Sequence, residues 1–274
     1  MKKITKVVIP IAGNGTRFLP ITKTISKTLL PLIDKPVIQY LIEECVAAGI
    51  KDVLLVLGPN QSDVMDYFDL ESKYVINLGQ THLELDKLKE LTNKINISYA
   101  IQDKPKGLAD AVYKSKEFAS GDDFALILGD DLVISKDGNY GIGDLCNYYK
   151  ENNGYYIGVQ EVKPEDTYKY GIIKPKSKQG NIIIVDSMVE KPKDNPPSNY
   201  ACVGRYILKN GIYEAIEKIT CGVGGELQLT DALNLVLKNE TVYASTFNGK
   251  RYDVGSKREY IEAIKAVLEI RTDI

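Results

Sequence analysis

The residues of this 274-residue chain that could carry chemistry are mainly cations and carboxylates that lie beside glycine loops. The first group follows the apolar run Val7–Ala12, where the sequence continues GNGTRF and includes Gly13, Gly15 and Arg17. Glycine has no Cβ, so such a loop can turn sharply and bring backbone N–H groups close to an anion. Arg17 adds a planar fork of donors for phosphate oxygens, and Lys27 adds a compact positive charge. Together these residues predict a cradle for a polyphosphate.

The glycine loop has a simpler interpretation when it is taken alone. Phe18 stands where the dinucleotide fingerprint G-x-G-x-x-G has its third glycine, and no GK[ST] sequence forms a P-loop. Two glycines after a strand are often an ordinary turn, and a lone lysine is often a solvated surface charge. Both interpretations stay open on the loop alone.

Two aspartates, Asp130 and Asp131, follow the apolar run Phe124–Leu128 after a single glycine. In an open α/β sheet, side chains that follow a strand lie at the carboxyl edge, where such folds bind ligands. Carboxylates there suit Mg²⁺, which prefers oxygen ligands and often shares its coordination with water and substrate phosphates. The alternative is a helix cap or a turn.

A second junction between a strand and a helix contains Gln102 and Gly107, in the sequence QDKPKGLADAV. The amide of Gln102 can both donate and accept a hydrogen bond, as reading the edge of a pyrimidine requires, and Gly107 permits close backbone approach. A polar strand end before a helix would explain the same residues.

A carboxylate and a cation also lie side by side in VEKP, as Glu190 and Lys191. The carboxylate can accept hydrogen bonds from adjacent sugar hydroxyls, and the lysine can neutralise a phosphate. Such a pair before a proline is also common on protein surfaces.

Strand-like and helix-like segments alternate along the chain, which predicts a largely parallel sheet covered by helices on both faces. We expect a helix from Pro36 to Gly49, a strand in the VLLVLG run after Asp52, a largely helical segment from Asn60 to Leu91, and a strand at Ile95–Gln102. From about Gly154 onward, closely spaced strands with Gly, Pro and Asn turns predict antiparallel hairpins.

Composition indicates an ordinary globular protein, with 44% hydrophobic and 26% charged residues and a net charge of −2. This balance gives no general attraction to nucleic acid or a membrane, and we expect neither partner. Without a signal-peptide core or a run of about 18 apolar residues, a cytoplasmic location is expected. The four cysteines lack C-x-x-C spacing, which predicts reduced and mostly buried thiols, and the single histidine, His82, has no partner for a metal site.

Ordered motifs across nearly the whole chain resemble those of sugar-1-phosphate nucleotidyltransferases, particularly bacterial-type UTP–glucose-1-phosphate uridylyltransferases. That family reads G-x-G-T-R, L-P, a lysine and a second L-P, as this chain does between Gly13 and Pro31. The resemblance continues through DKPVIQY (34–40), VEKP (189–192), PSNYACVGRY (197–206), ELQLTDA (226–232) and YDVGS (252–256).

The resemblance implies a three-layer, Rossmann-like nucleotidyltransferase fold, with a mixed, mostly parallel sheet and helices on both faces. It implies one domain over 1–274, with a nucleotide-binding half at 1–153 and a sugar-phosphate-binding half at 154–274. The implied reaction is Mg²⁺-assisted in-line transfer of a uridylyl group from UTP to glucose 1-phosphate, giving UDP-glucose and pyrophosphate without a covalent intermediate. A homo-oligomer, dimer or tetramer, is also implied.

The resemblance further implies a role for each matching residue. Arg17 and Lys27 would be catalytic, and Asp130 and Asp253 would bind the metal, while Asp131 lies at a variable position of the family and receives no role. The nucleotide would be bound by Ala12, Gly13, Gly15, Thr16, Gln102 and Gly107, and the sugar phosphate by Gly171, Glu190, Lys191 and Gly204.

Departures from the family pattern lie close to these residues. Residues 26–31 read SKTLLP where the family commonly has P-K-E-M-L-P, and Asp110 stands where histidine is frequent. The choice between UTP and dTTP, the sugar and the rate are therefore left open. The alternatives are a thymidylyltransferase on the same sugar phosphate, a glycosyltransferase with aspartates on a metal, and a non-catalytic regulatory homologue.

Overall fold

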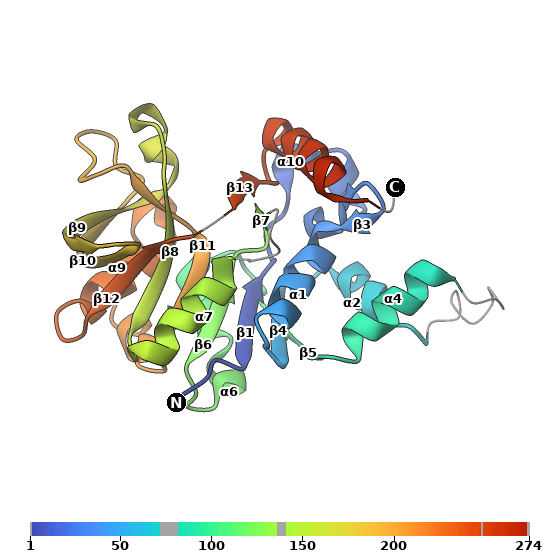
Figure 1. The fold of residues 1–274 in the computed structure, drawn as a ribbon, viewed down its shortest axis with the longest axis horizontal. Helices are drawn as coiled ribbons and strands as arrows, with labels where there is room; N and C mark the ends of the chain where they lie inside the picture. The colour runs from blue at the N-terminus through green and yellow to red at the C-terminus, as the bar shows by residue number, and fades with distance from the viewer. Residues whose placement is uncertain (1, 72–81, 136–140, 248, 273–274) are drawn as a thin grey trace.

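One nine-stranded sheet runs through both halves of the chain in the computed structural model, which describes residues 2–71, 82–135, 141–247 and 249–272 (Figure 1). The strand order is β5-β4-β1-β6-β11-β8-β12-β10-β9. The strands are β1 Lys6–Pro10, β4 Asp52–Leu57, β5 Asn96–Ile101, β6 Phe124–Ile127, β8 Tyr155–Glu161, β9 Gly171–Gln179, β10 Ile182–Glu190, β11 Tyr200–Leu208 and β12 Val242–Thr246.

Parallel pairing dominates the first half of this mixed sheet. Strands β5, β4, β1 and β6 are all parallel neighbours. Strand β11 runs antiparallel to β6 and β8, and β10 runs antiparallel to β9 and β12, whereas β12 is parallel to β8. Antiparallel pairing thus dominates the second half, as expected, but among the described strands of the main sheet only β9 and β10 are consecutive and paired as a hairpin.

Two short ribbons lie outside the main sheet. Strand β2 (Pro31–Leu32) pairs with β3 (Lys35–Pro36), and β7 (Asp131–Ile134) pairs antiparallel with β13 (Lys250–Asp253). The second ribbon puts Asp253 directly opposite Asp131 although 122 residues separate them in the sequence. The β7–β13 ribbon therefore holds the segment that precedes α10 against the segment that follows β6.

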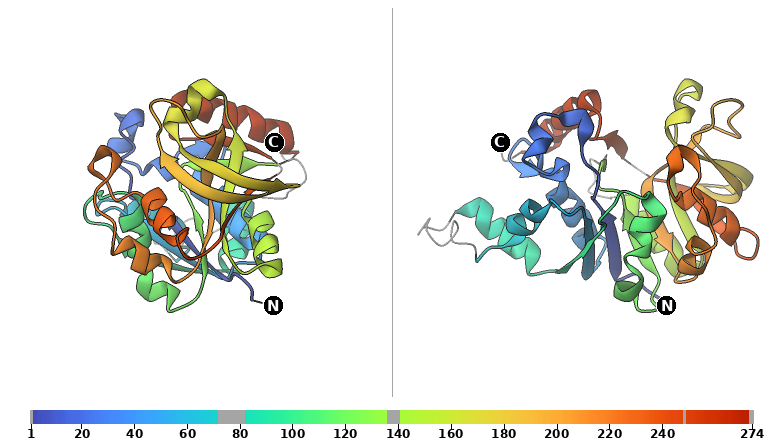
Figure 2. Two further views of the ribbon diagram at one scale, coloured as in Figure 1. Left: turned by 90° about the vertical axis from the view of Figure 1, so that its left-hand side faces the viewer. Right: turned by 180° about the vertical axis from the view of Figure 1, so that it is seen from behind.

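Two apolar cores cover the opposite faces of the main sheet. Within β1, Val7 and Ile9 belong to one core and Val8 to the other, as expected from the alternation of side chains along a strand. Figure 2 shows helices on both sides of the strands. The helices are α1 Val37–Ala47, α2 Ser62–Phe68, α4 Leu83–Thr92, α5 Leu108–Tyr113, α6 Lys116–Ala119, α7 Gly141–Glu151, α8 Ile212–Ile216, α9 Leu229–Val236 and α10 Lys257–Ile270, with 3₁₀ helices η1 Thr16–Phe18, η2 Ile21–Lys23, η3 Lys27–Leu29, η4 Pro164–Lys169 and η5 Val223–Gly225.

The expected elements occur close to their predicted bounds. Helix α1 begins directly after Pro36, and Gly49 lies just beyond its end with a φ of 76°. The segment predicted to be largely helical contains α2 and α4, while its residues 72–81 lie outside the described part of the chain. Three of the four free cysteines are buried, as predicted, and Cys221 is exposed.

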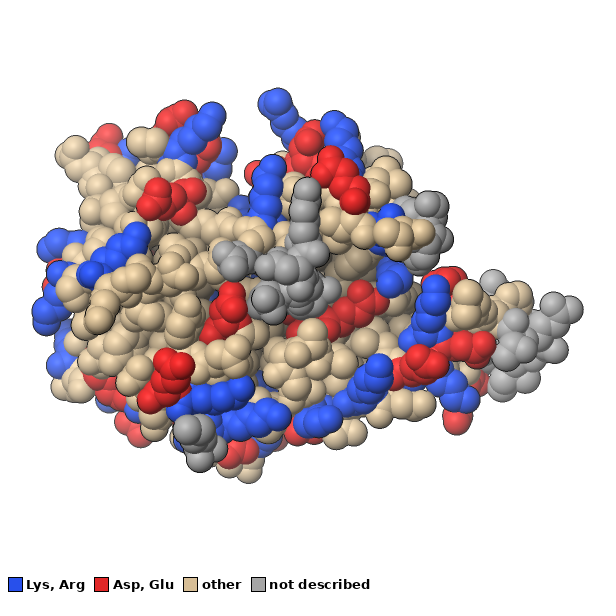
Figure 3. Space-filling model, viewed as in Figure 1, with Lys and Arg blue, Asp and Glu red and all other residues tan. Residues whose placement is uncertain are grey.

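The described residues include no helix that is both long and apolar enough to span a bilayer. On the face drawn in Figure 3, basic and acidic side chains are interspersed rather than gathered into one patch. This distribution agrees with the net charge of −2.

A buried ion pair ties helix α1 to the centre of the sheet. The Arg205 guanidinium of β11 donates from Nε and Nη2 to the two Glu44 carboxylate oxygens, at 2.8 and 2.7 Å, and both side chains are almost inaccessible to solvent. The backbone N–H of Ile142 also donates to Glu44, at 3.1 Å. The carboxylate is thus satisfied from three directions, and loss of either partner would leave a buried charge unpaired.

We expect Glu44→Ala to lower the free energy of unfolding by roughly 3–5 kcal/mol, since an uncompensated guanidinium would remain in the core. Urea unfolding followed by circular dichroism measures this. The matched control is Glu262→Ala, which removes the carboxylate of an exposed pair with Lys265. The control should leave the midpoint nearly unchanged, and equal losses in the two variants would contradict the argument.

Candidate functional site

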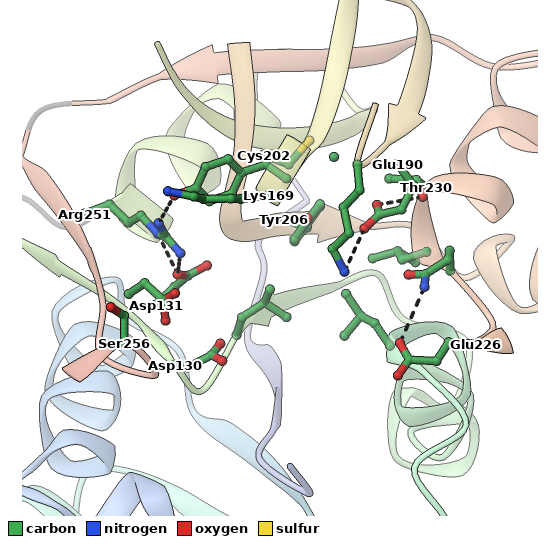
Figure 4. Close-up of a pocket in the computed structure, with 18 of the residues that line it drawn as sticks. Asp130, Asp131, Lys169, Glu190, Cys202, Tyr206, Glu226, Thr230, Arg251 and Ser256 are labelled. Carbon is green, nitrogen blue, oxygen red and sulfur yellow. Dashed lines mark hydrogen bonds and ion pairs between the residues drawn. The ribbon is translucent and has the colours of Figure 1, made fainter. Parts of the chain in front are cut away.

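A cavity of about 580 Å³ lies where the two halves of the sheet meet (Figure 4). Its walls contain residues from both halves, and a second cavity of about 290 Å³ adjoins the glycine loop. Of the residues predicted from the sequence, the larger cavity is lined by Arg17, Asp130, Gly171, Glu190, Lys191 and Asp253. The smaller cavity is lined by Ala12, Gly13 and Lys27.

Two cations and two carboxylates lie together between these cavities. Lys27 Nζ is 2.9 Å from Asp130 Oδ2, and Arg17 Nη1 is 3.3 Å from Asp253 Oδ2. The Lys27 side chain is only 16% exposed, so its charge is held close to Asp130. Burial alone would raise the pKa of Asp130, but the Lys27 ammonium, the Arg251 charge and a backbone hydrogen bond together outweigh burial, and the pKa is lowered.

Gly255 lies directly against this group of charges. A Cβ on Gly255 would lie 2.9 Å from Asp253 Oδ1, 3.3 Å from Lys27 Nζ and 3.4 Å from Asp130 Oδ2. Both carboxylates therefore face one small space, which any side chain at this position would fill. The Gly255 N–H donates to Asp253 Oδ1 at 2.9 Å, and the Val254 N–H donates to the Asp130 carbonyl at 2.9 Å.

The donor set fits a hard divalent cation. Asp130 and Asp253 supply carboxylate oxygens, the ligands that such ions prefer. No cluster of three or more His, Cys, Asp or Glu side chains suited to a metal is present within the described residues. An ion held here would have two protein carboxylates and would take its other ligands from water and from the phosphates of a substrate.

Asp131, which was given no role from the sequence, lies beside this group as part of an ion pair. Arg251 Nε donates to Asp131 Oδ1 at 2.6 Å, and Arg251 Nη1 donates to the Tyr170 hydroxyl at 2.9 Å. Burial raises the pKa of Asp131 to about 6 despite the opposing charge of Arg251. Arg251 and Tyr170 line the larger cavity, and sequence reasoning missed both.

Gly204, predicted to bind the sugar phosphate, is not among the residues that line either cavity. A Cβ on Gly204 would lie 2.3 Å from Asp131 Oδ2, and its φ is 67°. The need for glycine here is therefore explained by the buried Asp131 carboxylate.

The Lys27 loop is fastened to helix α2 by a serine. The Ser26 N–H and hydroxyl donate to the two carboxylate oxygens of Asp63, each at 2.5 Å. A proline, common at this position in the resembled family, could make neither bond. The neighbouring Thr28 hydroxyl is buried and has no hydrogen-bond partner among the residues that the structure describes. Asp63 is thus a supporting residue of the Lys27 loop that the sequence did not reveal.

In the second half of the chain, the larger cavity is lined by the carboxylate of Glu190, which contacts two neighbouring side chains. Glu190 ends β10 opposite Gly171 of β9, and the Thr230 hydroxyl donates to Glu190 Oε2 at 3.1 Å. Lys191 Nζ lies 3.6 Å from Glu190 Oε1. The pair predicted from VEKP therefore faces the cavity, with Thr230 as an additional contact (Figure 4).

The base-recognition residues predicted from the sequence, Gln102 and Gly107, are at the edge of the site. Neither lines either cavity, but Leu108, next to Gly107, lines the larger one. Gly107 has a φ of 109°, and a Cβ there would lie 2.5 Å from the Leu227 carbonyl oxygen. The backbone that lies close to Gly107 is thus that of Leu227 in the same chain. Two further predicted residues, Gly15 and Thr16, also lie outside both linings.

The sequence and the fold of this chain are similar to those of known proteins. A profile described as Nucleotidyl transferase matches residues 6–270. The chain is 44% identical over 265 residues to a UTP–glucose-1-phosphate uridylyltransferase of Bacillus subtilis (strain 168), covering 95% of this chain and 90% of that protein. It is 43% identical over 270 residues to the enzyme of the same name from Mycoplasma genitalium, covering 95% and 90%.

A solved structure is also similar over its whole length. The crystal structure of UDP-glucose pyrophosphorylase complexed with UDP-glucose matches with a TM-score of 0.90 and 38% identity. The match covers 98% of this chain and 100% of that chain.

We expect Gly107→Ala to lower the free energy of unfolding more than Gly121→Ala does. Both glycines have positive φ, but a Cβ at Gly121 meets nothing within 4 Å. Gly121→Ala should therefore cost only the backbone strain of about 1–3 kcal/mol, while Gly107→Ala should cost a further 1–3 kcal/mol, roughly, from the clash with Leu227. Urea unfolding of the two variants tests this, and equal losses would show that the Leu227 contact yields freely.

Proposed function

The chain belongs to the nucleotidyl transferase family, and we infer that it is a UTP–glucose-1-phosphate uridylyltransferase, which makes UDP-glucose and pyrophosphate from UTP and glucose 1-phosphate. The resemblance seen in the motifs is confirmed by 44% identity over 95% of the chain. The geometric observation that supports this function best is the convergence of Lys27, Asp130 and Asp253 on the small space above Gly255.

We propose that the triphosphate lies along the loop from Ala12 to Arg17, with the glucose 1-phosphate against Glu190 and Lys191. The first position is supported by the cavity that adjoins the loop, and the second by the two charged side chains on the far wall. Arg17 lies between the two regions, so it can contact phosphates of either substrate. Binding both substrates in line would raise the rate by positioning them.

Charge neutralisation is the proposed source of the remaining catalysis. In the proposed reaction, an oxygen of the sugar phosphate attacks the α-phosphorus of UTP while pyrophosphate departs on the opposite side. Lys27, Arg17 and Lys191 would offset the negative charge of the reacting phosphates. We propose Mg²⁺ as the ion held by Asp130 and Asp253; when bound, it would reduce the charge repulsion between the phosphates.

The side chains that line the cavity also support direct transfer. Burial raises the pKa of the Cys202 thiol and of the Tyr206 hydroxyl well above their usual ranges, so both stay protonated at neutral pH. Neither is therefore an activated nucleophile. The remaining implications of the resemblance, a homo-oligomer in the cytoplasm and one domain with a nucleotide half and a sugar-phosphate half, stand as proposals alongside this mechanism.

Release of pyrophosphate tests the proposed function. The assay couples pyrophosphate to a colour change in the presence of UTP, glucose 1-phosphate and Mg²⁺, with omission of each component in turn. We expect release only with all three. No turnover with any sugar 1-phosphate would overturn the enzymatic assignment, and a preference for dTTP would move the protein to the thymidylyltransferases.

Replacement of Lys27 by alanine should lower kcat by roughly 100-fold or more, because the variant loses charge stabilisation of the reacting phosphates. The control is Lys89→Ala, which removes an exposed lysine on α4. The control should turn over at the wild-type rate. A Lys27→Ala variant within about threefold of wild type would show that this lysine only balances the charge of Asp130.

Asp130→Asn and Asp253→Asn should each raise the Mg²⁺ concentration needed for half-maximal rate, since each removes a negative charge from a site for a hard cation. The exposed Asp66 of α2 provides the control, Asp66→Asn. Because the two carboxylates would share one ion, the effects in the double variant should not be additive. Simple addition of the two shifts would mean that the aspartates act independently.

A further inference from the structure

The side-chain amide of Gln102 has an orientation set by its surroundings. Gln102 follows the end of β5 and is buried, with 6% of its surface exposed. Its Nε2 donates to Asp110 Oδ2 at 2.8 Å and to the Gly107 carbonyl oxygen at 3.2 Å. Both hydrogens of the amide nitrogen are therefore used by the chain itself.

Both partners of this nitrogen can only accept hydrogen bonds. An ionised carboxylate and a backbone carbonyl have no proton to donate. A flipped amide would place Gln102 Oε1 against two acceptors and would lose both hydrogen bonds, which is costly for a buried group. Of the two flips that a glutamine side chain allows, the contacts of Asp110 and Gly107 thus permit one.

The carbonyl oxygen of the Gln102 side chain, Oε1, remains available to a ligand. In the part of the chain that the structure describes, no hydrogen bond is made to Gln102 Oε1, and this oxygen is not among the fully buried atoms that lack a partner. The backbone N–H of Gln102 donates to the backbone carbonyl of Leu57, the last residue of β4. The residue after Leu57 is Gly58, and a Cβ on Gly58 would lie 3.2 Å from the backbone oxygen of Ala12. The backbone of Gln102 therefore lies beside the end of β4, which adjoins the glycine loop.

We propose that Asp110 is a specificity-determining residue that fixes the Gln102 amide so that only its carbonyl oxygen faces the nucleobase. This inference rests on the proposed function and on the nucleotide-binding role that the family resemblance implies for Gln102. A lone acceptor favours a base with N–H at position 3 of a pyrimidine ring, as in uracil and thymine. Cytosine has an unprotonated acceptor at that position, so the two acceptors would face each other. The sequence had predicted that Gln102 would offer both a donor and an acceptor; here it offers the acceptor alone.

The proposed role of Asp110 concerns position 3 of the pyrimidine ring and not the 5-methyl group, so loss of Asp110 should affect the two discriminations differently. Removal of the carboxylate frees the amide to flip and to donate to cytosine N3. Discrimination between UTP and CTP should therefore fall, while discrimination between UTP and dTTP should stay the same. A purely structural defect would weaken the binding of all three nucleotides alike.

The test measures dissociation constants of UTP, dTTP and CTP by calorimetry for wild type, Asp110→Leu and Asp110→Asn. Leucine has a similar size and removes the acceptor, while asparagine keeps the shape and can also donate to a flipped amide. We expect the UTP-to-CTP affinity ratio to fall at least roughly tenfold in Asp110→Leu and by a smaller factor in Asp110→Asn. The ratio of UTP to dTTP should change by less than about twofold. Thermal unfolding establishes that each variant is folded.

Two further variants separate the possible failures. Gln102→Ala should lower the UTP-to-CTP ratio as Asp110→Leu does, and Asp103→Asn, which alters an exposed neighbouring aspartate, should leave it unchanged. If Gln102→Ala lowers the ratio and both Asp110 variants keep it, the role of Asp110 is overturned. If Gln102→Ala also keeps it, Gln102 does not read the base and the inference fails with it. Because binding is measured without turnover, an absence of pyrophosphate release would overturn the proposed function separately.

Discussion

The antiparallel pairing of β7 with β13 is the constraint on which the rest of the site depends. It puts Asp253 opposite Asp131, and the backbone bond from Val254 to the Asp130 carbonyl fixes the same junction. Two carboxylates from distant parts of the chain thereby face one space with Lys27. Like charges this close repel, and the arrangement is tolerable because Lys27, Arg17 and Arg251 each pair with one of the three aspartates.

The two halves of the sheet make different contributions to this arrangement. The parallel strands β1, β4 and β5 end at one edge, where their following loops supply the glycine loop and the Gln102 region. The antiparallel strands β9, β10 and β11 form the opposite wall with Glu190 and Lys191. Strand β11 joins the halves, and the buried Arg205 of this strand is tied to Glu44 of helix α1. Strand β11 and its buried ion pair therefore fix the position of the two cavity walls relative to each other.

Sequence alone predicted most of the elements well, because they follow from local patterns. The apolar runs and the Gly and Pro signals located the strands and α1, and the motifs identified Arg17, Lys27, Asp130 and Asp253. The supporting residues were missed because their importance depends on contacts made across the fold. Asp63 matters through Ser26, 37 positions away, and Arg251 through Asp131, 120 positions away. Polar residues of this kind have no local pattern that distinguishes them from ordinary surface residues.

The central claim is that this site neutralises and positions phosphates and that no side chain becomes covalently attached to the nucleotide. The stereochemical course at the α-phosphorus tests it most directly. The measurement uses one diastereomer of UTP that carries sulfur in place of a non-bridging α-oxygen, with glucose 1-phosphate and the wild-type protein. A single in-line displacement predicts that the product has inverted configuration at phosphorus. Retention would require two successive displacements through a nucleotidylated side chain, and would contradict the account.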